Sequence, residues 1–246
     1  MRRFLGLVWG TVFVIFLWWL LAVLIDSPAL PTPQATWPEL VDNFQAIVPD
    51  FGVSLARLVL SLAIGTVLGV PLGLAIGLSK RGDEVFGPVL YVLYPVPKVI
   101  FLPVLFILFG LGGQAKVILI AIAVFFQTLV SMRDAAKEVP AGALVSLRSL
   151  GASGWQCFTN VVVPSTLPAL FTSLRISTGT AVAILFIAES MAGSTGLGYF
   201  IMHSWSLLEY ERMFAGIVAM AVLGVAFYEV FELCEHHATK WRRVQM

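Results

Sequence analysis

The sequence predicts an all-α, polytopic membrane protein with about six transmembrane helices. Apolar residues form 59% of the 246 residues and charged residues only 12%, against about half and about a quarter in soluble globular proteins. The mean hydropathy of +0.94 leaves too little polar surface to cover a water-soluble globule of this size. The chain also holds apolar runs of the length that a bilayer core requires, about 20 residues. A soluble enzyme is therefore excluded before any motif is considered.

The first predicted span is Phe4–Ile25, a run of 22 residues without a charge. At about 1.5 Å per residue it is long enough to cross the hydrocarbon core with some tilt. It is too long for the apolar core of a signal peptide, so we expect this helix to remain uncleaved. A polar stretch with five prolines follows over 26–50, and we expect it at the surface, with a short interfacial helix over 37–47.

Five further segments are apolar enough to cross the membrane. In chain order these predicted spans are 52–78, 85–109, 117–132, 167–191 and 213–231. The short charged turn Ser79–Glu84 joins the second span to the third, and residues 113–116 can extend the fourth. We treat residues 1–246 as one transmembrane domain, with a long polar loop over about 133–166.

Basic residues orient the predicted spans, because cytoplasmic loops of membrane proteins carry an excess of lysine and arginine. With a cytoplasmic N-terminus, ten of the 15 basic residues fall in inner segments and only Arg212 falls in an outer one. The inner residues are Arg2, Arg3, Lys80, Arg81, Arg133, Lys137, Arg148, Lys240, Arg242 and Arg243. We therefore expect both termini on the cytoplasmic side, where Cys157 and Cys234 should be free thiols.

Several classes of site are missing from the sequence. There is no Gly-x-x-x-x-Gly-Lys-Ser/Thr motif, so the chain cannot itself be an ATP-hydrolysing subunit. The glycine-rich segment Gly193–Gly198 follows no predicted strand and falls outside, so we do not interpret it as a phosphate cradle. No cluster of histidines, cysteines and carboxylates indicates a metal site or a catalytic centre. The net charge of +1 gives no reason to expect a nucleic-acid partner.

Small residues mark one face of the second predicted span. Gly65, Gly69, Gly73 and Gly77 recur every four residues and so lie on one side of a helix. Small residues at this spacing let two helices approach closely in a membrane, where packing holds helices together. We expect this ladder to be a helix-packing seam.

The polar loop over 133–166 is too long to be a simple connection, and loops of this length are usually functional. Gly151 can end one short helix, and Ser153 can cap the next. Pro164 and Pro168 can set the start of the fifth span. We therefore expect two short helices at a corner of the chain.

These two helices would present Trp155 and Phe158 on one face. An exposed aromatic pair on an inner loop is typical of a docking surface for a partner. The alternative is an interfacial helix that dips into lipid.

The loop also resembles that of a known family. The pattern Gly151-Ala152-Ser153-x-Trp155-x-x-Phe158, followed by Val163-Pro164-x-x-x-Pro168, is similar to the loop with which permease subunits of binding-protein-dependent ABC importers engage their ATPase. Within that superfamily the chain resembles the nitrate, sulfonate, taurine and bicarbonate branch. The resemblance runs from about Leu30 to Lys240. Further matching segments are Ser54–Arg57, Phe101–Gly110, Ala188–Met191 and Gly196–Tyr199.

The resemblance implies a type I ABC importer permease fold in the inner membrane of a prokaryote. It implies that two permease chains, expected to be a homodimer, form a translocation path within the lipid. Two cytoplasmic ATPase subunits would hold ATP and Mg, and an external solute-binding protein would deliver the solute. This chain would hold no cofactor and catalyse no reaction. Closure of the ATPases would switch the path between inward-open and outward-open states.

The resemblance also implies which residues contact the ATPase. They are Leu147, Gly151, Ala152, Ser153, Trp155, Phe158, Pro164 and Pro168. One departure is notable, because the family's loop usually begins Glu-Ala-Ala, and here those positions hold Val145, Ser146 and Leu147. The usual acidic contact is therefore missing. We expect either a compensating ATPase surface or a coupling that depends more on the two aromatic residues.

Ionisable residues within spans are costly and are candidates for function. Arg57 and Glu189 fall near the outer ends of the second and fifth spans, where they can form an ion pair or a gate that contacts substrate. Lys116 is expected to anchor the fourth span at the outer interface.

Lys98 falls near the middle of the third span, after Tyr94-Pro95-Val96-Pro97. The two prolines should break the helix and free backbone carbonyls. Lys98 is expected either to line an anion path, resting on these carbonyls until substrate replaces them, or to be tied permanently to a carbonyl or carboxylate. Tyr94, Gln127 and Thr128 offer further polar groups for the path, together with Arg57 and Glu189.

The sequence favours import of a small anion such as nitrate, a sulfonate, taurine or bicarbonate. An ATP-independent secondary transporter or channel is an alternative, as is an ABC permease for a thiamine-precursor pyrimidine. A membrane-embedded enzyme is disfavoured by the missing catalytic cluster. Because selectivity in such importers rests mainly with the binding protein, this sequence does not identify the substrate.

Overall fold

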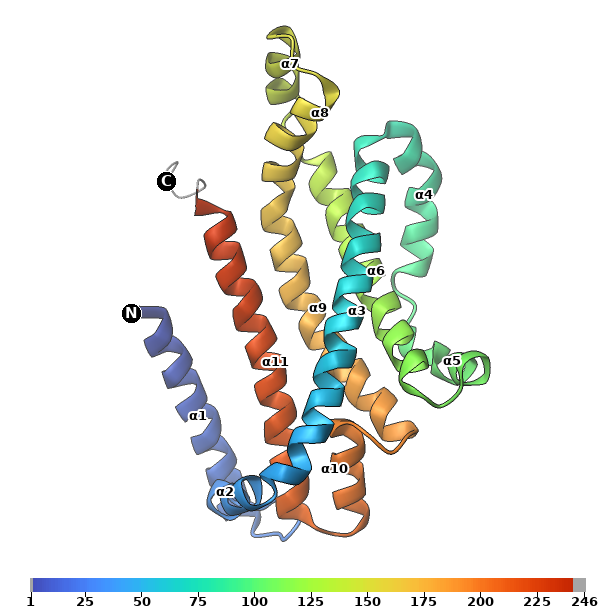
Figure 1. The fold of residues 1–246 in the computed structure, drawn as a ribbon. Helices are drawn as coiled ribbons and strands as arrows, with labels where there is room; N and C mark the ends of the chain where they lie inside the picture. Colours follow the sequence, from blue (N-terminus) through green and yellow to red (C-terminus); the bar gives the residue numbers. More distant parts are fainter. Residues whose placement is uncertain (1, 241–246) are drawn as a thin grey trace. The chain divides into compact units, whose positions relative to one another are not determined.

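The computed structural model describes residues 2–240, with side chains described from Leu5 onward. Arg242 and Arg243, which contribute to the predicted orientation, lie outside the described residues. The described part of the chain is helical, with no β-strand in residues 2–240 (Figure 1). The predicted all-α class is therefore confirmed.

Five helical segments are long and apolar enough to cross a bilayer, and a bent pair can make a sixth crossing. The five are α1 (Arg2–Ile25), α3 (Phe44–Leu78), α6 (Gly113–Lys137), the continuous run Gly154–Met191 and α11 (Tyr210–Ala238). The bent pair consists of α4 (Lys80–Leu93) and Lys98–Phe109, with 80° between its two arms. The third span is thus broken, as its two prolines predict.

Some predicted boundaries are wrong. The structure has a 10-residue helix α2 (Pro33–Asp42), which starts where Thr32 caps it and Pro33 occupies the first turn, and this is the arrangement that suits a helix N-terminus. Helix α3 then begins at Phe44 instead of residue 52, so the surface connection is shorter than predicted. Helix α10 (Leu197–Ser206) has no counterpart in the sequence prediction.

The chain divides into two compact units, one of residues 1–54 and 189–222 and the other of residues 55–188 and 223–246. Helices α3, α9 (Val163–Met191) and α11 each contribute residues to both units. The division therefore falls within helices and not at a linker.

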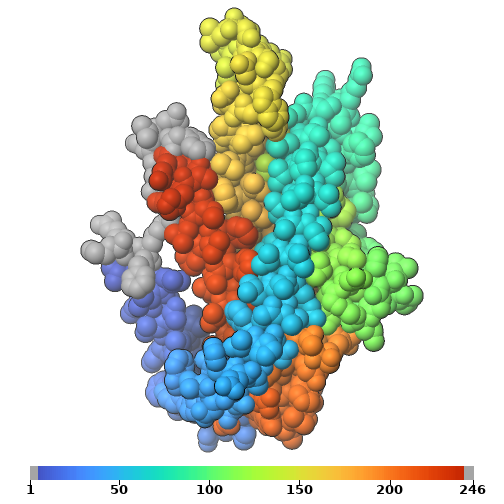
Figure 2. Space-filling view, in the orientation of Figure 1, coloured from blue at the N-terminus to red at the C-terminus, as the bar shows by residue number. Residues whose placement is uncertain are grey.

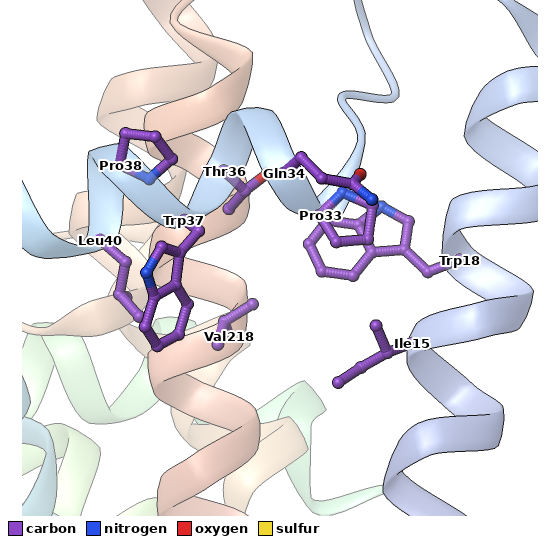
Figure 3. Close-up of a pocket in the computed structure, with 9 residues that line it drawn as sticks. All are labelled: Ile15, Trp18, Pro33, Gln34, Thr36, Trp37, Pro38, Leu40 and Val218. Atoms are coloured by element: carbon purple, nitrogen blue, oxygen red, sulfur yellow. The ribbon is translucent and has the colours of Figure 1, made fainter.

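In the first unit, Trp18 of α1 makes two specific contacts. Its ring stacks on Phe214 of α11 with 5.4 Å between centroids, and its indole N–H donates to the Pro31 carbonyl at 2.9 Å. An apolar hollow of about 530 Å³ opens beside it. Figure 3 shows Trp37 of α2 and Val218 of α11 at this hollow. Because most of α1 is exposed in the chain, this face is available to lipid or to a second chain.

In the second unit, the glycine ladder of α3 lies against α6. A Cβ added at Gly65 would be 2.7 Å from the Cβ of Val124, and one at Gly69 would be 2.9 Å from the Phe125 carbonyl oxygen. One and two turns further along, a Cβ added at Gly73 would likewise be too close to the Cβ of Met132, and one at Gly77 too close to the Cβ of Ala136. These four positions of the seam therefore have room for the hydrogen of glycine but not for a methyl group.

An ion-pair cluster ties α11 to α9 within the second unit. Arg175 of α9 pairs with Glu232 and Glu235 of α11, and its guanidinium lies 5.8 Å from the centre of the Tyr228 ring. All three charged side chains are about one-fifth exposed. A cation held between two carboxylates in partly buried surroundings restrains both helices at this level.

The glycine seam gives a direct test. Gly73→Ala should lower the stability of the purified protein by about 1–3 kcal/mol, because a Cβ there would meet the Cβ of Met132 at 2.9 Å. The matched control is Gly179→Ala in α9, where nothing lies within 4 Å of an added Cβ. The control should be neutral or stabilising by up to about 1 kcal/mol, since alanine favours helix. Equal thermal stabilities for the two variants would contradict the seam.

Candidate functional site

A lysine side chain binds the backbone carbonyls at the break between α4 and α5 (Leu102–Phe109). The Lys98 ammonium donates to the carbonyls of Leu93 at 2.8 Å, Tyr94 at 2.9 Å and Val96 at 2.7 Å. An ammonium group has three N–H donors, so all three are used. Pro97 lies four residues after Leu93 and has no N–H to continue helical bonding to that carbonyl. The break therefore releases acceptors, and Lys98 satisfies them.

Two aromatic rings complete the surroundings of this ammonium. Lys98 Nζ lies 4.7 Å from the centre of the Phe126 ring and 6.0 Å from that of Tyr94, within the range of cation–π attraction. Phe126 is near the middle of the 25-residue helix α6, and the depth of Lys98 in the bilayer stays a prediction. We refer below to the three carbonyls and two rings as the carbonyl cage.

The other predicted polar groups of α6 are placed differently. Gln127 is half-buried, and Thr128 is fully buried where α6 packs on Gly69 of α3. The Thr128 hydroxyl has no hydrogen-bond partner among the described residues. The position of Thr128 belongs to the helix seam, so it does not support a place for this residue on a substrate path.

A hollow of about 380 Å³ opens beside the broken turn. It is lined by Gly87, Leu90, Tyr91, Tyr94 and Pro95 of α4 and the break, and by Val130, Arg133 and Asp134 of α6. Tyr94 therefore belongs both to this hollow and to the carbonyl cage. The hollow runs along the two helices toward their charged ends.

The charged ends of α4 and α6 are clamped together. The Asp83 carboxylate accepts hydrogen bonds from Arg133 and from Lys137, the latter at 2.7 Å. Arg133 also lies 3.2 Å from the Asp134 carboxylate. The guanidinium in the hollow is thus already neutralised by carboxylates.

The hairpin formed by residues 141–162 is fixed by local motifs. Helix α7 (Ala141–Ser149) ends with the N–H of Gly151 donating to the Arg148 carbonyl at 3.0 Å and that of Ala152 to the Leu147 carbonyl at 3.1 Å. This is a Schellman motif, and Gly151 has the positive φ of +82° that it requires. The predicted helix end therefore lies where the glycine indicates.

The next helix begins in a capping box. The Ser153 hydroxyl accepts from the Gln156 N–H at 3.3 Å, and the Gln156 side chain accepts from the Ser153 N–H at 2.7 Å. From there α8 (Gly154–Cys157) passes through a π-helical turn, η2 (Phe158–Val162), directly into α9.

The predicted separate second helix is therefore wrong. Pro164 and Pro168 lie inside one continuous helical run instead of starting a span. The π-helical turn directly precedes Pro164, which has no N–H to bond the carbonyl four residues earlier.

The tip of the hairpin is apolar and exposed. Leu150 is 85% exposed, Trp155 71% and Val145 62%. Figure 2 shows this tip, in yellow, standing clear of the neighbouring segments of its unit. Arg148 is the one charged residue in the sequence from 141 to 162. Large apolar side chains at such exposure are typical of an interaction surface.

Phe158 does not share this exposure, which corrects the predicted aromatic pair. Its ring stacks on Trp155 with 5.6 Å between centroids, but it is half-buried and packs on the core cluster that includes Leu74, Met132 and Val162. Phe158 therefore anchors the hairpin and supports Trp155, whereas Leu150 and Val145 provide the additional exposed surface.

The glycine-rich loop of the first unit, residues 193–198, binds a carboxylate of the chain itself. Glu189 is fully buried, and its two oxygens lie 2.9 and 2.8 Å from the Ser54 hydroxyl oxygen. The Gly198 N–H, in the first turn of α10, donates to the same carboxylate at 3.0 Å, and a helix N-terminus favours a negative charge.

Two more contacts hold this loop on α3. The Leu197 N–H donates to the Ser54 hydroxyl at 2.8 Å, and the Gly196 N–H donates to Asp50 at 2.6 Å. Gly196 has φ +105°, and a Cβ there would overlap the Glu189 carboxylate. The segment is therefore an anion cradle, with Glu189 as its anion.

The remaining predicted charges are placed as follows. The Arg57 guanidinium lies beside Gly113, at the start of α6, since a Cβ there would be 3.4 Å from Arg57 Nε. Lys116 is 1% exposed, so the expectation of an interfacial anchor is wrong. The pairing of Arg57 with Glu189 would join the two units and stays a prediction.

Sequence reasoning missed Phe126, Ser54, Asp50 and Leu150. Phe126 precedes the predicted Gln127 by one residue, but no periodicity indicates that its ring lies under Lys98. Ser54 and Glu189 are separated by 135 positions, and only the folded chain shows that they meet. The exposure of Leu150 was predictable from the sequence, because a large apolar residue before a helix-ending glycine at a loop tip is exposed.

The chain was compared with known proteins. Residues 65–239 match the family described as binding-protein-dependent transport system inner membrane component. The taurine transport system permease protein of Escherichia coli is 31% identical over 242 residues, which cover 94% of this chain and 88% of that protein. A putative aliphatic sulfonates transport permease protein of Bacillus subtilis is 30% identical over 221 residues, covering 89% and 80%.

A solved structure shares the fold. The inward-facing methionine ABC transporter has a chain that superposes with a TM-score of 0.66 at 19% identity, over 78% of this chain and 96% of that one. This likeness shows the type I importer permease fold.

The carboxylate cradle generates a prediction. Ser54→Ala should destabilise the permease by about 1.5–3 kcal/mol, because it removes a donor from a buried charge and the acceptor of the Leu197 N–H. Ser206→Ala is the matched control, since the exposed Ser206 hydroxyl donates only to the His203 carbonyl. The control should change stability by less than about 0.5 kcal/mol. Thermal unfolding at matched detergent concentration measures both, and equal effects would refute the cradle.

Proposed function

The chain belongs to the family of binding-protein-dependent transport system inner membrane components, and from this premise we propose that it is the permease subunit of an ATP-driven importer of a small sulfonate. Two copies would form the path, with two ATPase subunits inside and a solute-binding protein outside. The family match over residues 65–239 and the exposed inner hairpin support this proposal. The hairpin is the observation that carries it.

The hairpin is proposed as the ATPase contact. Its capping box and Schellman motif fix the backbone, so little conformational entropy is lost when a partner binds. The exposed surface is apolar, with Val145 at the position where the family usually has an acidic residue. We infer that the ATPase receives Leu150 and Trp155 in an apolar groove and has no need of a carboxylate from this chain. ATP and Mg would be bound by that partner.

The broken helix is proposed as the substrate path. A half-buried ammonium at mid-depth faces backbone carbonyls and not a carboxylate, so its positive charge is not neutralised by these contacts. An anion that reaches this point gains a charge-assisted contact. It can then move along the hollow of about 380 Å³ between α4 and α6. Alternating access would follow if ATPase closure moves the hairpin, which is continuous with α9.

The substrate class rests on the two relatives. Their names refer to taurine and to aliphatic sulfonates, and both substrates carry the anion that Lys98 would attract. Nitrate, bicarbonate or a thiamine-precursor pyrimidine are alternatives within the wider family. An ATP-independent transporter is the alternative outside it, and it would need no exposed inner hairpin.

The orientation is proposed from the basic residues. Both termini and the hairpin would be cytoplasmic, and the cradle around Glu189 would lie outside. The outer connections carry Asp26, Glu39, Asp42, Glu209 and Glu211. This acidic character suits a basic surface on the solute-binding protein.

The docking hypothesis is tested by removing the exposed tip. Leu150→Ala with Trp155→Ala should weaken ATPase binding by about 2–4 kcal/mol, as for a two-residue hot spot. The matched control is Trp205→Ala with Leu207→Ala, which removes equivalent side chains, each about half exposed, from the outer helix α10 and its C-terminal cap. Co-purification of tagged permease with its ATPase measures the effect. Full ATPase retention by the hairpin variant would refute the proposal, as would equal loss from the control.

A further inference from the structure

The carbonyl cage has the chemistry of a binding site for an ammonium group. Three carbonyl oxygens lie 2.7–2.9 Å from one nitrogen, and the Phe126 ring covers it at 4.7 Å. Carbonyl oxygens and aromatic faces both attract ammonium cations. Nothing in this arrangement is specific to the lysine that occupies it, because any primary ammonium has the same three donors.

Lys98 reaches the cage through its own side chain, by contacts that are local in the sequence. The ammonium returns to the carbonyls of residues two, four and five positions earlier in the chain, and its four-carbon stem has several rotatable bonds. Two of its three hydrogen bonds are exposed. The ammonium can therefore leave the cage by side-chain rotation, without moving a helix.

Departure of Lys98 has a cost that depends on the substrate. A simple anion that draws the ammonium out leaves three carbonyls without their charged donor, and the Val96 carbonyl among them is part-buried, where an unmade hydrogen bond is expensive. A substrate that brings its own ammonium removes this cost, because that group takes the place of Lys98. Sites built to hydrogen-bond a group discriminate strongly against analogues that lack it.

We propose that the cage binds the ammonium group of a zwitterionic substrate, which exchanges with Lys98 while Lys98 pairs with the anionic group of the same molecule. The substrate class is then a small aminosulfonate or amino acid with a short spacer between its charges. This inference rests on the proposed function, because it requires that substrate passes Lys98. The hollow beside Tyr94 and Pro95 provides room for the rest of the molecule.

Direct binding to the complete importer tests the exchange. Two permease chains with their ATPases, in nanodiscs without binding protein, would be titrated calorimetrically with taurine, ethanesulfonate and ethylammonium at equal ionic strength. Taurine should bind at least about tenfold more tightly than either singly charged analogue. Equal binding of taurine and ethanesulfonate would overturn the exchange and leave the anion path intact. If neither taurine nor ethanesulfonate binds, the proposed anion path past Lys98 is overturned as well.

An emptied cage gives a second test. In Lys98→Ala the carbonyls lack their ammonium, so ethylammonium chloride should raise the melting temperature of this variant more than equimolar sodium chloride does. Wild type should show no such difference, since Lys98 occupies its cage. Lys80→Ala is the matched control, because Lys80 is exposed, and it should behave as wild type.

Phe126→Leu on the Lys98→Ala background should reduce the ethylammonium effect by removing the ring over the cage. Recovery of folded Lys98→Ala only in the presence of ethylammonium would likewise support the proposal, because it too shows stabilisation of this variant by ethylammonium. An equal response of Lys98→Ala to both salts, or a response of Lys80→Ala to ethylammonium, would overturn the proposal.

Discussion

The contact between Lys98 and the carbonyls of Leu93, Tyr94 and Val96 is the interaction on which the candidate path depends. A membrane-spanning chain must satisfy its backbone polar groups internally, because hydrocarbon offers them no partners. Pro95 and Pro97 prevent the helix from doing so here. The ammonium replaces the missing donors, and this permits the 80° bend that separates α4 from the following helix. The same contact holds a positive charge without a carboxylate partner in the cage.

The glycine-rich loop of the first unit follows the same rule with the charges reversed. There a buried carboxylate, Glu189, is satisfied by the Ser54 hydroxyl and by the N–H of Gly198 at the start of α10. The half-buried Lys98 ammonium is thus bound by backbone carbonyls, and the buried Glu189 carboxylate by a side-chain hydroxyl and a backbone N–H. The consequence differs between the two sites. The cradle requires glycine at position 196 and is rigid, whereas Lys98 reaches its carbonyls on a flexible stem and can leave them.

The sequence predicted the spans because a bilayer imposes a length of about 20 apolar residues, which hydropathy detects directly. It also predicted the break before Lys98, because two prolines act locally. The bend angle was not predictable, since it depends on how the second arm packs on α6. Trp155 and Phe158 were predicted as one exposed pair, yet only contact with Leu74 and Met132 shows that Phe158 is an anchor. Lys116 was misplaced because burial of a charge depends on neighbours distant in sequence.

The proposed path requires that the passing substrate contact Lys98. Lys98→Met keeps the length of the side chain and removes its charge, and its effect can be measured in proteoliposomes containing the permease, its ATPase and the binding protein. We expect taurine uptake to fall at least about tenfold, while assembly and binding-protein-stimulated ATP hydrolysis persist. Unchanged uptake by a fully assembled Lys98→Met importer would contradict the account, because Lys98 would then serve only to close the broken helix.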